Sequence, residues 1–233
     1  KLLQISGIGP ASLLGDLGVP VRAALDGVGE NLRDHYSVRM VARAKNALTI
    51  NEYARWPRLP LEVVKWLRGK PSVLALCPTI AFVHAKSHPA LEEADMRILF
   101  TPGSYQDGKT YVLDDYPGMT CGAAQPRPES TGYVRAQSSD PAEPPVIQPN
   151  YLSAEVDRQI TLAGVRLARK LMNSPEMAPY FDTETLPGPQ AQSIIHIHRK
   201  VRKHPKGAIA PHHRICPGKA LHQNGGNLQL PSA

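Results

Sequence analysis

The chain has 233 residues, 42% of them hydrophobic, which is enough for one large or two small globular domains. No window approaches the roughly 18 uninterrupted apolar residues of a membrane span, and no signal-peptide pattern opens the sequence. Its cysteines, Cys77, Cys121 and Cys216, lack the number and spacing of a disulfide framework or a zinc site. We therefore expect a globular protein of a reducing compartment, the cytoplasm.

The net charge of +7 is carried by the end of the chain. Up to Ser193 the 20 basic residues equal the 20 acidic ones, whereas residues 194–233 hold seven Lys and Arg, no acid and six of the nine histidines. A basic tail can bind nucleic acid or another anionic surface, but this one lacks interleaved aromatic residues and a recognised motif. We expect a solvated or disordered tail and no nucleic-acid partner.

The first elements expected in chain order are short. A helix over residues 11–17 begins at Pro10, which suits the first helical position, and ends at Gly18. A short strand is expected at residues 19–21, and a longer one at residues 36–44, where apolar and polar residues alternate.

Two glycine-rich turns lie among these elements, one at Gly7 to Gly9 and one at Gly27 to Asn31. The first turn lacks the third glycine of a dinucleotide-binding fingerprint. Only five residues precede its Ser6, so no full strand is visible before the turn. From the residues alone, a structural turn is favoured over a phosphate cradle.

The middle of the chain predicts a sheet. A helix is expected within residues 59–70, ended by Gly69 and Pro71. Four strand-like runs follow, beginning at residues 79, 95, 118 and 131, and clusters of Pro, Gly, Asp and Ser separate them. Because no helices alternate with these runs, the pattern indicates an antiparallel sheet.

The clearest helix follows a proline-rich extended connection at residues 140–153. Over residues 154–172, apolar residues recur at steps of three and four, which predicts one buried face. The sheet is its expected partner. The fold class expected is therefore α+β: an antiparallel sheet with flanking helices.

Several candidate sites have simple structural explanations. The Asp34–His35 pair is more typical of a turn cap than of acid–base catalysis. The histidine pairs at 196/198 and 212/213 lack accompanying carboxylates, so we expect no metal. No G-x-S-x-G motif is present to indicate a hydrolase.

Three stretches together resemble the glucose-methanol-choline family of flavin-dependent oxidoreductases, and of these the choline dehydrogenase-like members: "LLQISGIGP", "LGVPV" and "LDGVGENLRDH". The likeness continues through "QPRPESTGYVRAQSSDPAEPPVIQPNYLSAEVDRQITLAGVRLARKL", residues 125–171. The first stretch is similar to the second half of a family signature. We therefore expect the chain to begin inside that signature, without the family's N-terminal FAD-binding fold.

The resemblance implies FAD as cofactor and an alcohol, such as choline or a primary alcohol, as the small-molecule substrate. Residues 1–35 would be a remnant that borders the FAD-binding domain, and residues 36–193 would form the substrate-binding domain. The implied cofactor-proximal residues belong to the two glycine turns: Ser6, Gly7, Ile8, Gly9, Gly27, Gly29 and Asn31. A chain with only these parts is expected to be inactive by itself.

Residues 194–233 depart from the family pattern. His204-Pro205 and Cys216 match the family's active-site stretch only faintly, so His204 is a weak candidate for the catalytic base. Loss of acids after Ser193 is what a shifted reading frame produces, and a divergent tail is the other explanation. The resemblance leaves dehydrogenase, oxidase and lyase activities open, as well as the oligomeric state. The alternative function is a non-enzymatic binding module whose basic tail contacts nucleic acid or an anionic surface.

Overall fold

The computed structural model describes residues 1–106, 109 and 112–193. Its helices are α1 (Leu2–Ile5), α2 (Ala11–Asp16), α3 (Ile50–Tyr53), α4 (Arg58–Leu67), the 3-10 turn η1 (Val73–Ala75) and α5 (Glu155–Met172). Its strands are β1 (Ile8–Gly9), β2 (Ala23–Ala24), β3 (Ser37–Ala44), β4 (Ala81–Ala85), β5 (Met96–Thr101), β6 (Gly118–Ala124), β7 (Tyr133–Arg135), β8 (Val146–Gln148) and β9 (Phe181–Leu186).

Five strands form the central sheet in the order β4-β5-β6-β3-β9, and the neighbours run antiparallel. The alternation of side chains decides which residues face the core. In β3, Val38, Met40 and Ala42 are buried on one face, and in β5 Met96 and Ile98 lie on that same face. The antiparallel sheet expected from the sequence is thus present, but the run that begins at residue 131 is not part of it: it forms β7, which pairs with β8 in a separate hairpin.

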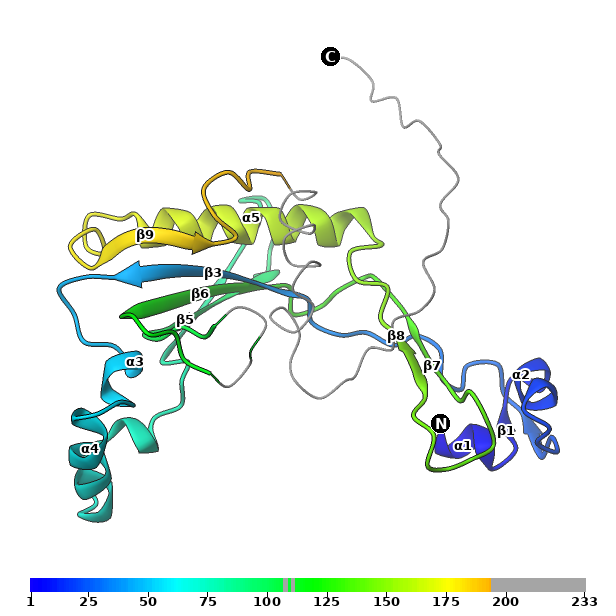
Figure 1. Cartoon of the computed structure of the whole chain (residues 1–233). Helices are drawn as coiled ribbons and strands as arrows, with labels where there is room; N and C mark the ends of the chain where they lie inside the picture. The colour runs from blue at the N-terminus through cyan, green and yellow to red at the C-terminus, as the bar shows by residue number, and fades with distance from the viewer. Residues whose placement is uncertain (107–108, 110–111, 194–233) are drawn as a thin grey trace.

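Helix α5 covers the core face of the sheet (Figure 1). Its apolar stripe, which includes Val165, Ala168 and Met172, packs on β3, β5 and β6. At Gly164 an added Cβ would lie 2.9 Å from the Cβ of Ala123, so glycine permits the close approach of helix and sheet. The helix predicted over residues 154–172 therefore packs where the sequence indicates.

A second, smaller lobe is formed by the start of the chain and the hairpin β7–β8 (Figure 1). Strand β1 pairs in parallel with β2, and β7 pairs with β8. Leu32 forms a bridge with Gly132, and Arg135 forms an ion pair with Glu30 at 2.8 Å. Segments about 100 residues apart in the sequence therefore make one unit.

The structure corrects several predicted elements. The short strand lies at Ala23–Ala24 and not at residues 19–21, because both Arg22 and Ala23 donate their N–H groups to the carbonyl of Gly7. Pro10 is the residue before helix α2 and has extended ψ, so it is not the first helical residue. The proline-rich connection contains strand β8, and β9, α1 and α3 were not predicted.

Candidate functional site

The two glycine turns named as cofactor-proximal come together around the side chain of Gln4. Gln4 is fully buried. Its Nε2 donates to the carbonyls of Val28 (3.1 Å) and Val134 (3.2 Å), and its Oε1 accepts from the N–H of Ala136 (2.8 Å). The first turn lies beside the Gln4 side chain, since a Cβ added at Gly9 would be 3.4 Å from the Cγ of Gln4. The sequence-predicted residues thus form one cluster.

Other segments of the chain pack closely against two glycines of this cluster. Gly7 has a φ of +88°, and an added Cβ would lie 2.5 Å from the carbonyl oxygen of Pro20. Gly29 has a φ of +90°, and its Cβ would lie 2.3 Å from the carbonyl of Val134. Both conformations favour glycine. These contacts within the chain explain why glycine stands at both positions.

The other members of the cluster are less constrained. An added Cβ at Gly27 meets nothing within 4 Å, and Asn31, with a φ of 59°, occupies the left-handed region that asparagine tolerates. Ser6 is the residue that ends α1, and Ile8 begins β1. Of the turn glycines, Gly27 has the open surroundings that a ligand would need.

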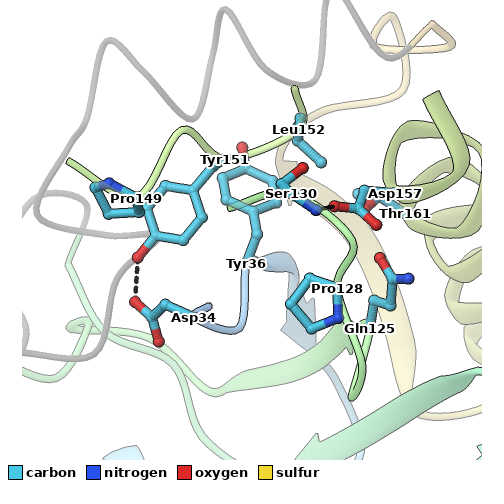
Figure 2. Close-up of a pocket in the computed structure, with 10 residues that line it drawn as sticks. All are labelled: Asp34, Tyr36, Gln125, Pro128, Ser130, Pro149, Tyr151, Leu152, Asp157 and Thr161. Carbon is cyan, nitrogen blue, oxygen red and sulfur yellow. Dashed lines mark hydrogen bonds between the residues drawn. The ribbon is translucent and has the colours of Figure 1, made fainter. Parts of the chain in front are cut away.

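A small pocket lies where the β7–β8 lobe meets α5 (Figure 2). The Tyr151 hydroxyl donates to the Asp34 carboxylate, and the Tyr36 and Tyr151 rings lie 5.4 Å apart between centroids. Burial raises the pKa of Tyr151, and the adjacent Asp34 carboxylate raises it further. Burial raises the pKa of Tyr36 as well. Both phenols therefore stay protonated at neutral pH.

Asp157 closes this pocket from the first turn of α5. Its carboxylate accepts N–H bonds from Glu129 (2.9 Å) and Ser130 (2.8 Å). Burial raises the pKa of Asp157, but the hydrogen bonds from the Ser130 side chain and from these two N–H groups outweigh it, so the pKa is lowered. The charged carboxylate fixes the chain that leads into β7.

The pocket is too small for a substrate. Its cavity volume is about 10 Å³, which is room for about one water molecule. The side-chain oxygen of Gln125 is buried there without a hydrogen-bond partner among the described residues, and it lies beside Asp157 (Figure 2). One water can satisfy that oxygen, so the pocket is structural.

The sheet face opposite α5 carries a different set of side chains. The register places Arg97 of β5, Ala124 of β6 and Ser37 of β3 in one row. Leu99, Gly122 and Arg39 form the next row. No helix among the described residues covers this face, which we call the open face (Figure 1).

The open face is basic. His84 is opposite Arg97 across β4 and β5, and both lie on this face with Arg39 and Arg43. At the described positions of β3, β4, β5 and β6, no Asp or Glu occupies it. The Nε of Arg97 is buried and has no hydrogen-bond partner among the described residues. The basic character of this face comes from side chains on β3, β4 and β5.

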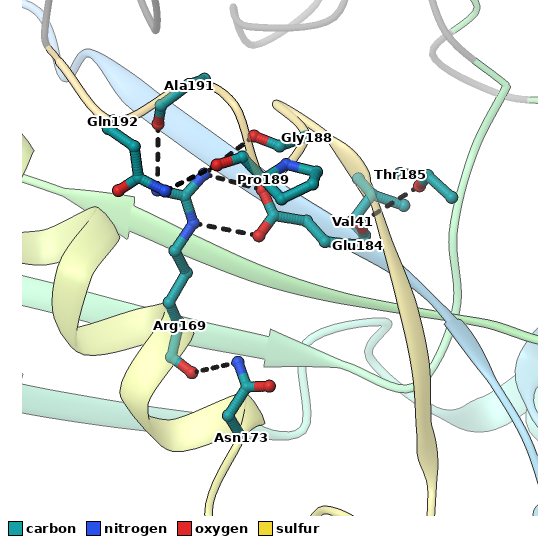
Figure 3. Close-up of polar contacts among 9 residues, drawn as sticks. All are labelled: Val41, Arg169, Asn173, Glu184, Thr185, Gly188, Pro189, Ala191 and Gln192. Atoms are coloured by element: carbon teal, nitrogen blue, oxygen red, sulfur yellow. Dashed lines mark hydrogen bonds and ion pairs between the residues drawn. The ribbon is translucent and has the colours of Figure 1, made fainter.

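Behind the sheet, Arg169 of α5 fixes the last strand (Figure 3). Its guanidinium forms two bonds to the Glu184 carboxylate, at 2.8 and 3.0 Å, and two more to the carbonyls of Gly188 and Ala191. The side chains of Arg169 and Glu184 are 15% and 9% exposed. This ion pair holds β9 against β3 and so extends the open face.

Sequence reasoning missed the open face. Its signal is present in β5, "MRILFT", where a single arginine interrupts an apolar run at a position that alternates with the buried Met96 and Ile98. Asp34 and His35 do not form an acid–base pair: the His35 ring contacts the carbonyl of Pro126 at 2.8 Å, and Asp34 accepts from Tyr151. His204 lies outside the described residues.

Comparison with known proteins gives a consistent result. Residues 128–213 match the C-terminal family model of GMC oxidoreductase. An oxygen-dependent choline dehydrogenase of Pseudomonas aeruginosa (strain LESB58) is 32% identical over 211 residues, 91% of this chain and 37% of the relative. One from Escherichia coli O139:H28 is 29% identical over 91% of this chain and 38% of the relative.

Solved structures share the fold. A formate oxidase superposes with a TM-score of 0.75 and 19% identity over 87% of this chain and 40% of that one. Pyridoxine 4-oxidase from Mesorbium loti superposes with a TM-score of 0.69 and 19% identity over 91% of this chain and 37% of that one. The chain thus spans well under half the length of the proteins that it matches.

Proposed function

Because the chain belongs to the GMC oxidoreductase family, we propose that it forms the substrate side of an FAD-dependent enzyme that oxidises the CH–OH group of a small alcohol. The observation that carries this proposal is the five-stranded antiparallel sheet with α5 on one face and a basic open face on the other. The match to choline dehydrogenases over 91% of the chain supports it.

FAD supplies the two-electron chemistry of alcohol oxidation in this proposal. The described residues that border it in this proposal are the two glycine turns, in which Gly7 and Gly29 are packed against backbone carbonyls. We propose that the cofactor is held mainly by protein beyond the length matched here. Residues 1–35, with the β7–β8 hairpin, would border that FAD-binding part, residues 36–193 would form the substrate domain, and the chain alone would be inactive.

The chain's own contribution is to bind and orient the alcohol at the open face. Arg97, His84 and Arg39 lie on this face. Positive charge repels a quaternary ammonium and attracts oxygen acceptors. Between choline and a primary alcohol, we propose a neutral or anionic primary alcohol as the substrate.

Flavin retention tests the proposal. The product of the complete gene that encodes this chain is purified, and its visible absorption is compared with that of an Arg97→Gln variant. We expect both proteins to hold flavin, because Arg97 is placed toward the substrate. A soluble, folded product of the complete gene that never retains flavin would overturn the proposed function.

A further inference from the structure

Helix α4 is attached to the protein by a charged residue. Glu62 is the one buried residue of α4, at 4% exposure. Its carboxylate accepts hydrogen bonds from Lys65 Nζ (2.6 Å) and from the N–H of Val73 (2.9 Å). Its backbone carbonyl accepts from the hydroxyl of Ser72 at 2.8 Å. A polar anchor thus fixes the helix to η1.

The apolar side chains of α4 point away from the protein. A helix of a globular protein normally buries its apolar face. Here Leu67 is 70% exposed and Trp66 is 52% exposed. The exposed apolar residues of α4 are Leu61, Val63, Val64, Trp66 and Leu67. The helix packs against α3 and η1 and projects from the end of the sheet (Figure 1).

Basic residues occupy the opposite side of this amphipathic helix. Val63 and Leu67 are four residues apart and share one side, while Arg58 and Lys65 are seven residues apart and share the other. Arg68 and Lys70 continue the basic group and are exposed. The only acid between residues 55 and 80 is the buried Glu62. Because Lys65 is paired with Glu62 at 2.6 Å, the exposed positive charge of this segment comes from Arg58, Arg68 and Lys70.

Both tryptophans of the chain lie at this surface. Trp66 is on α4. Trp56 lies two residues before the first residue of α4 and is 84% exposed. Exposed Leu74 and Leu76 of the adjoining η1 segment add to the apolar surface. Trp, Leu and Lys or Arg in this arrangement are typical of helices that lie in the plane of a lipid bilayer surface.

We propose that α4 with Trp56 is a docking surface for an anionic lipid bilayer. The apolar side enters the acyl boundary, and Arg58, Arg68 and Lys70 contact the lipid phosphates. A bilayer is favoured as the occupant because exposed basic residues flank the apolar side and the only acid between residues 55 and 80 is buried. None of the helices in the described part of the chain has the length and apolar character of a membrane span. The proposed contact does not depend on the proposed oxidoreductase function.

Vesicle binding of the full chain tests the proposal, with the two tryptophans as the probe. The chain is titrated with vesicles of phosphatidylcholine and phosphatidylglycerol, and separately with vesicles of phosphatidylcholine alone. We expect a blue shift of tryptophan emission and co-sedimentation with the anionic vesicles. Both effects should weaken as salt is raised, because the basic residues are screened.

Variants at exposed positions locate the contact without disturbing the fold. Leu67→Gln should weaken binding to anionic vesicles about tenfold or more, because burial of one leucine side chain is lost. Leu2→Gln is the matched control, since Leu2 is 75% exposed in the other lobe, and should leave binding unchanged. The double variant Arg68→Gln/Lys70→Gln should weaken it about 25-fold, at about fivefold for each basic residue.

Three results would overturn the proposal. One is no emission shift with anionic vesicles. Another is equal binding to both kinds of vesicle. The third is a concentration-dependent blue shift without vesicles that Leu67→Gln abolishes, which would mean that a second copy of the chain covers α4.

Discussion

The side-chain oxygen of Gln4 accepts a 2.8 Å hydrogen bond from the N–H of Ala136, which is 132 residues away in the sequence. Together with its bonds to Val28 and Val134, it joins the start of the chain to the β7–β8 hairpin. The Gln4 amide is therefore one of the contacts that hold the small lobe together, and four substitutions test how the fold is held.

Gln4→Leu should lower the free energy of unfolding by about 2–4 kcal/mol, because it leaves buried backbone groups without partners. Gln137→Leu is the control, since exposed Gln137 makes one bond, to Pro144, and should cost less than about 0.5 kcal/mol. Urea unfolding of both variants measures the difference. Equal losses would show that Gln4 does not join the lobe.

Gly29→Ala should destabilise the protein by more than about 2 kcal/mol. Its φ of +90° and a Cβ 2.3 Å from the Val134 carbonyl require both backbone strain and a shift of β7. Gly27→Ala, where a Cβ meets nothing within 4 Å, should change stability little. Thermal unfolding compares the two, and a costlier Gly27 variant would contradict the packing of this turn.

Glu184→Gln should cost about 3–5 kcal/mol, because it leaves the Arg169 charge buried without its partner. The control is Glu155→Gln on α5, the helix that carries Arg169; it breaks the exposed Arg158–Glu155 pair and should cost less than about 1 kcal/mol. Chemical denaturation measures both. Similar losses would mean that burial does not distinguish these ion pairs.

Asp157→Asn should remove part of the acid dependence of stability. The pKa of Asp157 is lowered in the folded protein, so its contribution is present above the ordinary carboxyl pKa of about 3.9 and is lost as pH falls through the folded value. Unfolding from pH 7 to pH 3 should show a smaller loss for Asp157→Asn than for the parent. Asp16→Asn, at an exposed position, should follow the parent curve.

Much of the fold was predictable because the strong signals are local. The stripe of α5 and the alternation of β3 identify their own buried faces. The position of β2 was not predictable from the sequence, since it depends on hydrogen bonds to Gly7 across a turn. Strand β9 lacks an apolar pattern because Glu184 pairs with Arg169, a contact that no local spacing indicates.

The candidate site was predicted only in part. The glycine turns do lie together, but what surrounds Gly7 and Gly29 is backbone from distant segments, and the sequence does not reveal that. The open face was missed because the register of four strands is needed to place Arg97, Arg39 and His84 on one face. Pairing over such distances is set by tertiary packing.

The central claim is that this chain forms the substrate side of a flavin-dependent alcohol oxidoreductase. The most direct measurement adds alcohols anaerobically to the purified product of the complete gene and follows the visible flavin absorption. The account predicts bleaching by a neutral or anionic primary alcohol, with weaker bleaching by choline and by the Arg97→Gln variant. Flavin that no alcohol bleaches would contradict it.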